Sequence, residues 1–153
     1  MNNIAMAGAL LLSAGVAAPG PAAALQATAN PWFGTILTDD AGRAVYVTSD
    51  ARDCIEECQL LWTPVPLEAI ASPEASLEAE QFGSTRGPAG EEQATYRGQP
   101  LFYFTEDFVP GDTNGQQFEE FGRVGFLITP NGVPFDKTID DECDCHMVEV
   151  ARN

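Results

Sequence analysis

The chain has 153 residues, with 7 basic and 23 acidic side chains, a net charge of −16 and one histidine. A surface this negative repels phosphate backbones and anionic lipids, which argues against nucleic acid and membrane-surface partners. One histidine excludes histidine-rich metal clusters and leaves little of the usual acid–base machinery of enzymes. The length suits a single domain with an independent core.

The N-terminal segment has the pattern of an export signal, because no charged side chain occurs before Asp39. Residues 6–18 form a short apolar run that is followed by a Pro-Gly-Pro turn and small residues, as in secretory signal peptides. We therefore expect residues 1–24 to be removed by cleavage after Ala24, with cleavage after Ala27 as the alternative. The apolar run is too short to span a bilayer. Export predicts a periplasmic or secreted protein.

Short apolar runs follow, separated by turn residues, and their β-branched and aromatic content favours strands over helices. The runs 35–38 and 44–48 flank an Asp-Asp-Ala-Gly sequence, which predicts a β-hairpin. Further strands are expected at 94–97, 100–104, 125–129 and 147–150. The pattern predicts a small, mostly β domain of antiparallel hairpins, barrel-like or sandwich-like.

Two segments have a helical pattern. Residues 53–62 begin with Asp53 and Glu56 in the spacing of a capping box, and a Thr-Pro pair ends the segment. The second segment, residues 75–81, is weaker and rich in glutamate. One or two short helices are therefore expected beside the strands.

The expected organisation has four parts. After the signal peptide come an N-terminal linker at 25–33, a β domain at 34–132 and a C-terminal extension at 133–153 that contains Cys-x-Cys-His-Met.

Four motifs carry a resemblance to a known family. Two of them are Gly34-x-x-Leu37-Thr-Asp39-x-x-Gly42-Arg43-x-x-Tyr46 and Cys54-x-x-x-Cys58-x-x-x-Trp62-Thr-Pro64. The others are Gln93-x-Thr95-Tyr96-x-Gly98-x-Pro100-Leu101-Phe102-Tyr103-Phe104-x-x-Asp107 and Pro110-Gly111-Asp112-Thr113-Asn114-Gly115-Gln116. Together, over residues 34–132, they resemble the bacterial secreted repeat of unknown function, also described as predicted lipoproteins with a Tyr-x-aromatic-x-x-Asp motif.

The resemblance implies a small, exported, β-rich envelope protein and no established reaction. The residues at the motif positions are Tyr46, Asp50, Trp62, Phe102, Phe104, Asp107, Asp112 and Asn114. Phenylalanine stands at position 102, where the family usually has tyrosine, which argues against a role for a phenol there. The cysteine that would carry a lipid is missing, so a free periplasmic or secreted form is expected.

The aromatic strand of the motif should divide its side chains between two faces. Phe102 and Phe104 are expected on one face and the alternate residues of 101–104 on the other, most of them in the core. Asp107 and Asp112 are predicted to stabilise turns by accepting hydrogen bonds from backbone N–H groups. The alternative is a cation or ligand site where two such turns meet.

The four cysteines indicate disulfides, because an exported chain enters an oxidising compartment. Cys54 and Cys58 are four residues apart, and a local bridge between them is the leading interpretation. Cys143 and Cys145 either close a small, strained and easily reduced ring or cross-link to the first pair.

The C-terminal extension also permits a metal interpretation. Cys143, Cys145, His146 and Met147 supply the soft ligands that copper(I) prefers. In an extended segment the two cysteines and Met147 share one face while His146 points away, which favours a three-sulfur site. No other cofactor is predicted.

The sequence carries no hydrolase elbow, metalloprotease helix, phosphate loop or dinucleotide fingerprint. We therefore expect an exported, non-enzymatic binding or accessory protein of the cell envelope, with an envelope protein or a small ligand as its partner. The alternative is a periplasmic copper(I)-binding or thiol-redox protein that uses the C-terminal cysteines.

Overall fold

The computed structural model of the chain describes residues 24–49, 56–70 and 72–135. They form a small, mostly β domain, which confirms the fold class predicted from the sequence. Residues 1–23 of the predicted signal peptide, the strand expected at 147–150 and the sites assigned to Asp50, Cys54 and the C-terminal Cys-x-Cys-His-Met lie outside the described residues.

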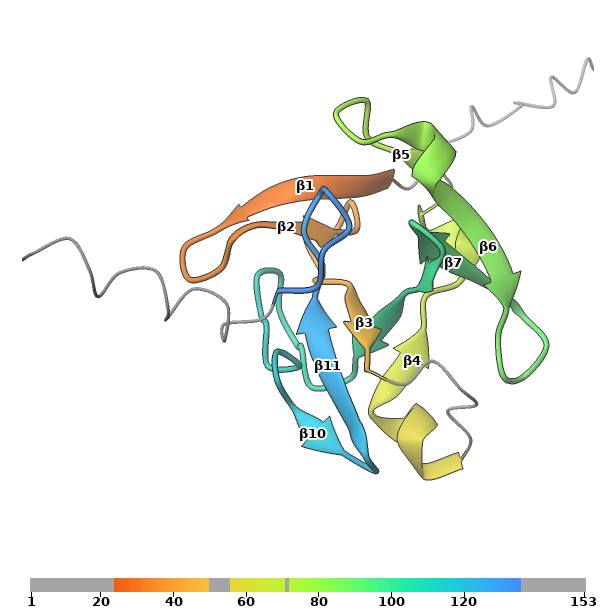
Figure 1. The fold of residues 1–153 in the computed structure, drawn as a ribbon. Coiled ribbons are helices and arrows are strands. Elements are labelled where there is room, and N and C mark those ends of the chain that lie inside the picture. The colour runs from red at the N-terminus through yellow and green to blue at the C-terminus, as the bar shows by residue number, and fades with distance from the viewer. Residues whose placement is uncertain (1–23, 50–55, 71, 136–153) are drawn as a thin grey trace, which may run out of the picture.

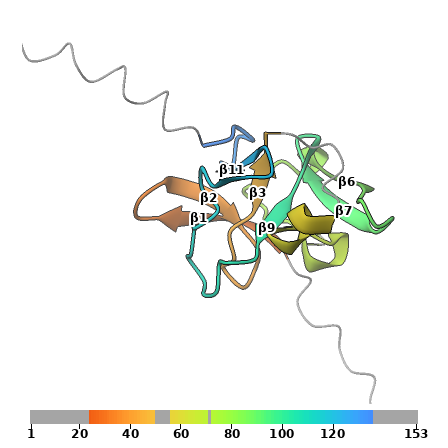
Figure 2. The ribbon, with the colours of Figure 1, turned by 90° about the horizontal axis from the view of Figure 1, so that it is seen from below.

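The described strands form three sheets, which Figures 1 and 2 show side by side. The first contains, in order, β2 (Gly34–Thr38), β1 (Ala24–Asn30) and β5 (Ser72–Pro73). The central sheet has the order β10 (Glu119–Glu120), β11 (Arg123–Leu127), β3 (Tyr46–Thr48), β9 (Phe102–Phe104) and β4 (Trp62–Pro64). The third has the order β6 (Phe82–Arg86), β7 (Glu92–Tyr96) and β8 (Gln99–Pro100).

The central sheet is antiparallel and carries the aromatic strand of the sequence motif. Tyr46 on β3 lies opposite Phe102 on β9, and Trp62 on β4 lies opposite Phe104. β11 pairs with the other side of β3, where Phe126 lies opposite Val47. The sheet therefore brings together segments that are far apart in the sequence.

The segment 25–33, predicted to be a linker, lies largely in a strand instead. Residues 26–30 of β1 pair antiparallel with β2, and residues 24–25 pair parallel with the short β5. Leu25 is fully buried in the core. From Leu25 to Asn30 the segment alternates apolar and polar residues, as a half-buried strand does, and the linker prediction overlooked this pattern.

The hairpin expected from 35–38 and 44–48 differs in part from the prediction. The chain does turn between these runs, where Thr38 bridges Ala44 and the Asp39 N–H donates to the Arg43 carbonyl at 2.9 Å. Beyond that bridge, β2 pairs with β1, and β3 joins the central sheet. The hairpin prediction is therefore confirmed next to the turn, where the Val45 N–H also donates to the Leu37 carbonyl at 3.2 Å, and the two runs have different partners farther from it.

Where the chain is described, the predicted helices are short 3-10 helices. In the segment 53–62 the described part contains a 3-10 helix, η1 (Glu56–Leu60), and then enters strand β4. In the segment 75–81 only a single turn of 3-10 helix is present, η3 (Ala79–Gln81). A further short helix, η2 (Leu67–Ile70), was not predicted. Trp62 becomes part of a strand because its fully buried ring packs with the aromatic residues of β9.

The core consists of two adjoining clusters that share strand β9. Phe102 and Phe104 pack in one cluster, with Tyr46 and Trp62. Leu101 and the ring of Tyr103 pack in the other, with aliphatic side chains from the first and third sheets. This confirms the predicted division of the aromatic strand between two faces.

The described part of the domain continues past the predicted boundary at 132. Pro134 bridges Ile128, and the Phe135 N–H donates to the Leu127 carbonyl at 2.7 Å. Within the described part of the chain, no helix combines the length and apolarity that crossing a bilayer requires.

Candidate functional site

Most of the described motif residues gather where the loop at 39–43 meets the loop at 105–114. The Gly111 N–H donates to the Gly42 carbonyl at 3.1 Å, which joins the two loops directly. Both glycines have a positive φ, 80° at Gly42 and 91° at Gly111, a conformation that other residues seldom adopt. A Cβ atom at Gly42 would also come within 3.2 Å of the Pro110 side chain. The two glycines therefore allow the loops to pack together.

Tyr46 and Asp107 form a buried pair across this junction. The Tyr46 hydroxyl donates to Asp107 Oδ2 at 2.7 Å, although the two residues are 61 positions apart. The Asn114 N–H donates to Asp107 Oδ1 at 2.8 Å, and the Asn114 side chain donates to the Glu106 carbonyl. Asp107 thus connects β3 to the turn that follows β9, and it accepts a backbone N–H as the sequence predicted.

Burial dominates the electrostatics of this pair. It raises the pKa of Asp107, an effect that the hydrogen bonds from Tyr46 and Asn114 oppose. Burial, together with the neighbouring carboxylate of Asp107, also raises the pKa of Tyr46 far above its usual value of 10. The Tyr46 phenol is therefore a neutral hydrogen-bond donor at physiological pH.

A second pair, Tyr103 with Asp39, spans the same junction. Here the aspartate belongs to the first loop and the tyrosine to β9. The Tyr103 hydroxyl donates to Asp39 Oδ2 at 3.0 Å across 64 positions. Asp39 Oδ1 accepts the N–H groups of Ala41 and Arg43, at 3.0 and 2.8 Å. The Arg43 guanidinium lies 4.1 Å from the centre of the Tyr103 ring and donates to the Phe104 carbonyl. Burial, followed by the charge of Asp39, raises the pKa of Tyr103.

The sequence motif contained Asp39, Arg43 and Tyr103, but they were not chosen as site residues. The Asp-Asp-Ala-Gly-Arg sequence indicated a turn, and Asp39 does stabilise that turn. Its second role depends on Tyr103, which is near only in three dimensions. The signal in the sequence was an aspartate in each of two turns, one before β3 and one after β9.

Asp112 holds the tip of the second loop. Its Oδ2 atom accepts the N–H groups of Phe108 and Val109, at 2.9 and 3.0 Å, as predicted for a turn-forming aspartate. The side chains of Phe108 and Val109 nevertheless point into solvent, with 82% and 59% of their surface exposed. The residues 108–110, which we call the apolar tip, are therefore held in place by their backbone and leave their side chains free.

The aromatic residues of the motif form the support beneath the junction. The ring centres of Trp62 and Phe104 are 4.7 Å apart, and those of Tyr46 and Trp62 are 5.5 Å apart. A Cβ atom at Gly125 would come within 2.0 Å of the Trp62 ring, so only glycine fits where β11 crosses it. Phe102 is buried in the same cluster, and its ring needs no hydroxyl there.

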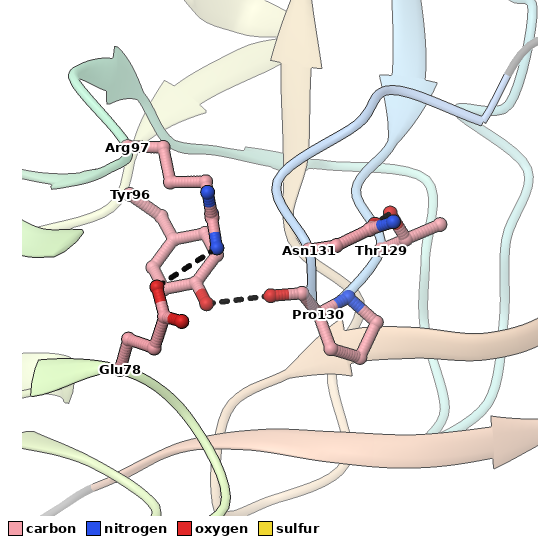
Figure 3. Close-up of polar contacts among 6 residues, drawn as sticks. All are labelled: Glu78, Tyr96, Arg97, Thr129, Pro130 and Asn131. Atoms are coloured by element: carbon pink, nitrogen blue, oxygen red, sulfur yellow. Dashed lines mark hydrogen bonds and ion pairs between the residues drawn. The ribbon is translucent and has the colours of Figure 1, made fainter.

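A separate polar cluster attaches the third sheet to the body (Figure 3). The Tyr96 hydroxyl donates to the Pro130 carbonyl at 2.6 Å, and Arg97 donates to Glu78 at 3.0 Å. Thr129 bonds to Asn131 within the turn that faces Tyr96. These contacts fix the inner side of the β7–β8 hairpin.

The predicted cysteine and metal sites lie mostly outside the described residues. Cys58 is buried and disulfide-bonded, while Cys54, Cys143 and Cys145 fall on undescribed positions, so the pairing remains a prediction. His146 and Met147 are likewise outside. Within the described residues, no group of three or more His, Cys, Asp or Glu side chains is arranged to hold a metal ion.

Comparison with known proteins identifies one related segment. Residues 84–124 match the model of the Lipoprotein_15 family, described as a secreted repeat of unknown function. The match confirms the resemblance for a narrower range than 34–132, and the description supports an exported location. The matched segment contains Asp107 and the apolar tip, whereas Tyr46 and Asp39 precede it. The comparisons with curated proteins and with solved structures find no match.

Proposed function

We propose that this chain is an exported, non-enzymatic binding module of the cell envelope that presents its apolar tip to an apolar pocket on a partner protein. The observation that carries the proposal is the exposure of Phe108 and Val109 on a loop where Asp112 accepts the N–H groups of both residues. The Phe108 side chain has 82% of its surface exposed. A partner that covered this apolar ring would remove it from water, which favours binding.

The mounting of the tip supports a binding role. Three connections act within a few residues of it: Asp112 to the backbone of the tip, Gly111 to Gly42, and Asp107 to Tyr46. A loop that is ordered before binding loses less conformational entropy when a partner arrives. Exposed aromatic side chains on such loops are typical anchors of protein interfaces.

The chemistry of the junction supports the non-enzymatic part of the proposal. Tyr46 and Tyr103 are buried and their pKa values are raised, so neither phenol is activated as a nucleophile or a base. Asp39 and Asp107 each accept hydrogen bonds from backbone N–H groups and from a tyrosine. These groups connect loops, and each of them is already engaged.

A photo-cross-linking experiment tests the proposal. The phenylalanine analogue benzoylphenylalanine is placed at position 108 in the exported protein, and at position 121 as the control. Phe121 is also exposed, at 52%, but belongs to the β10–β11 turn. We expect one discrete adduct from position 108 that is absent from position 121.

The partner in that adduct is then purified and titrated with the exported protein. The Phe108→Ser variant should bind at least about tenfold more weakly, because it removes a buried aromatic anchor, and Phe121→Ser should bind like the parent. The proposal is wrong if position 108 yields no adduct, or if Phe108→Ser binds the partner unchanged.

The proposal includes removal of the signal peptide after Ala24. Leu25 is fully buried and its carbonyl accepts the Glu74 N–H at 2.7 Å. Cleavage after Ala27 would delete this core residue, at a cost of about 2 to 5 kcal/mol for the lost side chain alone. Mass spectrometry of the exported protein should find Leu25 at the N-terminus, and a chain that begins at Thr28 would contradict this part.

A further inference from the structure

Strand β6 has one edge that no described strand covers. It is the outer strand of the third sheet, whose order is β6-β7-β8. Figure 1 shows it on the outside of the molecule, next to β7. The inner side of the sheet is occupied by the contacts of Tyr96, shown in Figure 3. Uncovered strand edges can pair with a further strand.

The register shows which backbone groups point outward. The Gly87 N–H donates to the Glu91 carbonyl, and the Arg97 N–H to the Gln81 carbonyl, so the odd-numbered residues of β6 face β7. The N–H groups of Ser84 and Arg86 and the carbonyls of Phe82 and Ser84 therefore point away from β7. An added strand would find both donors and acceptors there.

A hollow of about 470 Å³ is lined by residues 82–84 of β6 together with residues of η2 and β7. Its apolar part comes from Leu67 of η2 and from Phe82 at the start of β6. Its acidic part comes from the exposed side chains of Glu68 and Glu92. A segment paired with β6 would direct alternate side chains over this surface, because side chains alternate along a strand.

The charge of the surface selects among strand partners. Arg86, the basic residue of β6, donates to the Gly90 carbonyl at 2.8 Å and so turns toward its own hairpin. Glu68 and Glu92 therefore dominate the hollow. A second copy of this chain would also bring a net charge of −16, which opposes self-pairing.

We infer that the edge of β6 binds an extended, basic segment of a partner protein by strand addition. The partner backbone pairs with the outward groups of Phe82, Ser84 and Arg86. One apolar side chain of the partner covers Leu67 and Phe82, and its neighbours on the same face place lysine or arginine beside Glu68 and Glu92. The inference concerns a different sheet from the apolar tip and does not depend on it.

A fluorescent peptide, Lys-Thr-Val-Thr-Lys-Thr-Val with blocked ends, tests the inference with the whole exported protein. Its lysines and valines share one face when it is extended. Matched peptides replace lysine by glutamate, or carry N-methyl groups that remove alternate N–H donors. We expect each replacement to weaken binding at least about tenfold, since one reverses the charge and the other removes the backbone pairing.

Variants of β6 separate strand addition from simple charge attraction. In Ser84→Pro the outward N–H is lost, and proline is tolerated at an edge position whose N–H faces solvent. We expect this variant to fold, as circular dichroism would show, and to bind the peptide at least about tenfold more weakly. Ser84→Ala keeps the N–H and should bind like the parent.

The Glu68→Gln/Glu92→Gln double variant tests the contribution of charge. It should lose part of the affinity for the peptide and most of the salt dependence of binding.

Three results would overturn the inference. The first is absence of binding by the lysine peptide, and the second is equal binding by the N-methylated peptide or by a folded Ser84→Pro variant. The third is self-association through β6, seen as a dimer in sedimentation that Ser84→Pro abolishes. If Ser84→Pro does not fold, the N-methylated peptide decides the question on the parent protein.

Discussion

The two buried tyrosine–aspartate pairs make the same hydrogen bond in different electrostatic surroundings. Asp39 and Asp107 are equally buried, with 8% of each exposed. Asp39 accepts two N–H groups of its own turn, and Arg43 lies on the ring of its partner, Tyr103. Asp107 accepts a single N–H, from Asn114, and the nearby charge of Asp112 raises its pKa further.

The comparison shows how a chain with few cations buries carboxylates. Each Asp needs compensation for the water it loses on folding. At Asp39 two backbone N–H groups of the turn and the Tyr103 hydroxyl supply it. At Asp107 it comes from the Tyr46 hydroxyl and one backbone N–H, with a smaller contribution from the charge of Arg43. We therefore expect the Tyr46–Asp107 pair to depend more on its tyrosine, and the Asp39 turn to depend more on its carboxylate.

The largest expected effect is the loss of Asp39. Asp39→Ala removes the acceptor of three donors, and we expect it to lower the free energy of unfolding by about 2 to 4 kcal/mol. Asp107→Ala removes the acceptor of two donors and also removes a poorly compensated charge, so about 1 to 2 kcal/mol is expected. Urea unfolding at neutral pH measures both, and a larger loss in Asp107→Ala would break the comparison.

Removal of the hydroxyl groups should destabilise the Tyr46–Asp107 pair more than the Tyr103–Asp39 pair, which is the reverse of the order for the aspartates. Tyr46→Phe leaves Asp107 with one donor, and a loss of about 1 to 2 kcal/mol is expected. Tyr103→Phe leaves Asp39 with its two backbone donors, so about 0.5 to 1 kcal/mol is expected. Tyr96→Phe, which removes a hydrogen bond to the neutral Pro130 carbonyl, is the matched control. Equal losses in Tyr46→Phe and Tyr103→Phe would show that the surroundings do not matter.

The contribution of the nearby cation should be smaller. Arg43→Gln removes the guanidinium from the Tyr103 ring, where such contacts contribute about 0.5 to 1 kcal/mol. The loss should be nearly absent in a Tyr103→Leu background, because the ring is then missing. A full loss in that background would assign the effect of Arg43 to its bond with the Phe104 carbonyl.

The smallest effect concerns the pH dependence of stability. The pKa of Asp107 is raised above 3.8 in the folded protein, so the folded state binds this proton more tightly than the unfolded chain does. The resulting stability is fully present below pH 3.8 and is lost as the pH rises through the folded pKa. Asp107→Asn should remove the part of the decrease in stability with rising pH that is due to Asp107.

Urea unfolding between about pH 4 and pH 7 measures this slope. The exposed variant Asp40→Asn is the control, because it removes one negative charge without changing a buried group. If Asp107→Asn retains the slope of the parent, the burial of Asp107 does not contribute to the pH dependence.

Local chemistry made part of the site predictable. Asp112 and Asp107 were expected to accept backbone N–H groups, and they do, because an aspartate near a Pro-Gly turn reaches N–H groups only a few residues away. The alternation of Phe102 and Phe104 was likewise predictable from the period of a strand. The apolar tip was not predicted, because the sequence does not show which apolar residues remain exposed.

The sequence by itself determined the strand-forming runs, the turns and the two-faced aromatic strand, since each depends on neighbouring residues. Only the tertiary structure decided that Tyr46 meets Asp107 and Tyr103 meets Asp39, across 61 and 64 positions. It also decided that, away from the turn, β2 pairs with β1 instead of β3. Strand partners are selected by the apolar surface that the whole chain buries, and that total is not a property of any local segment.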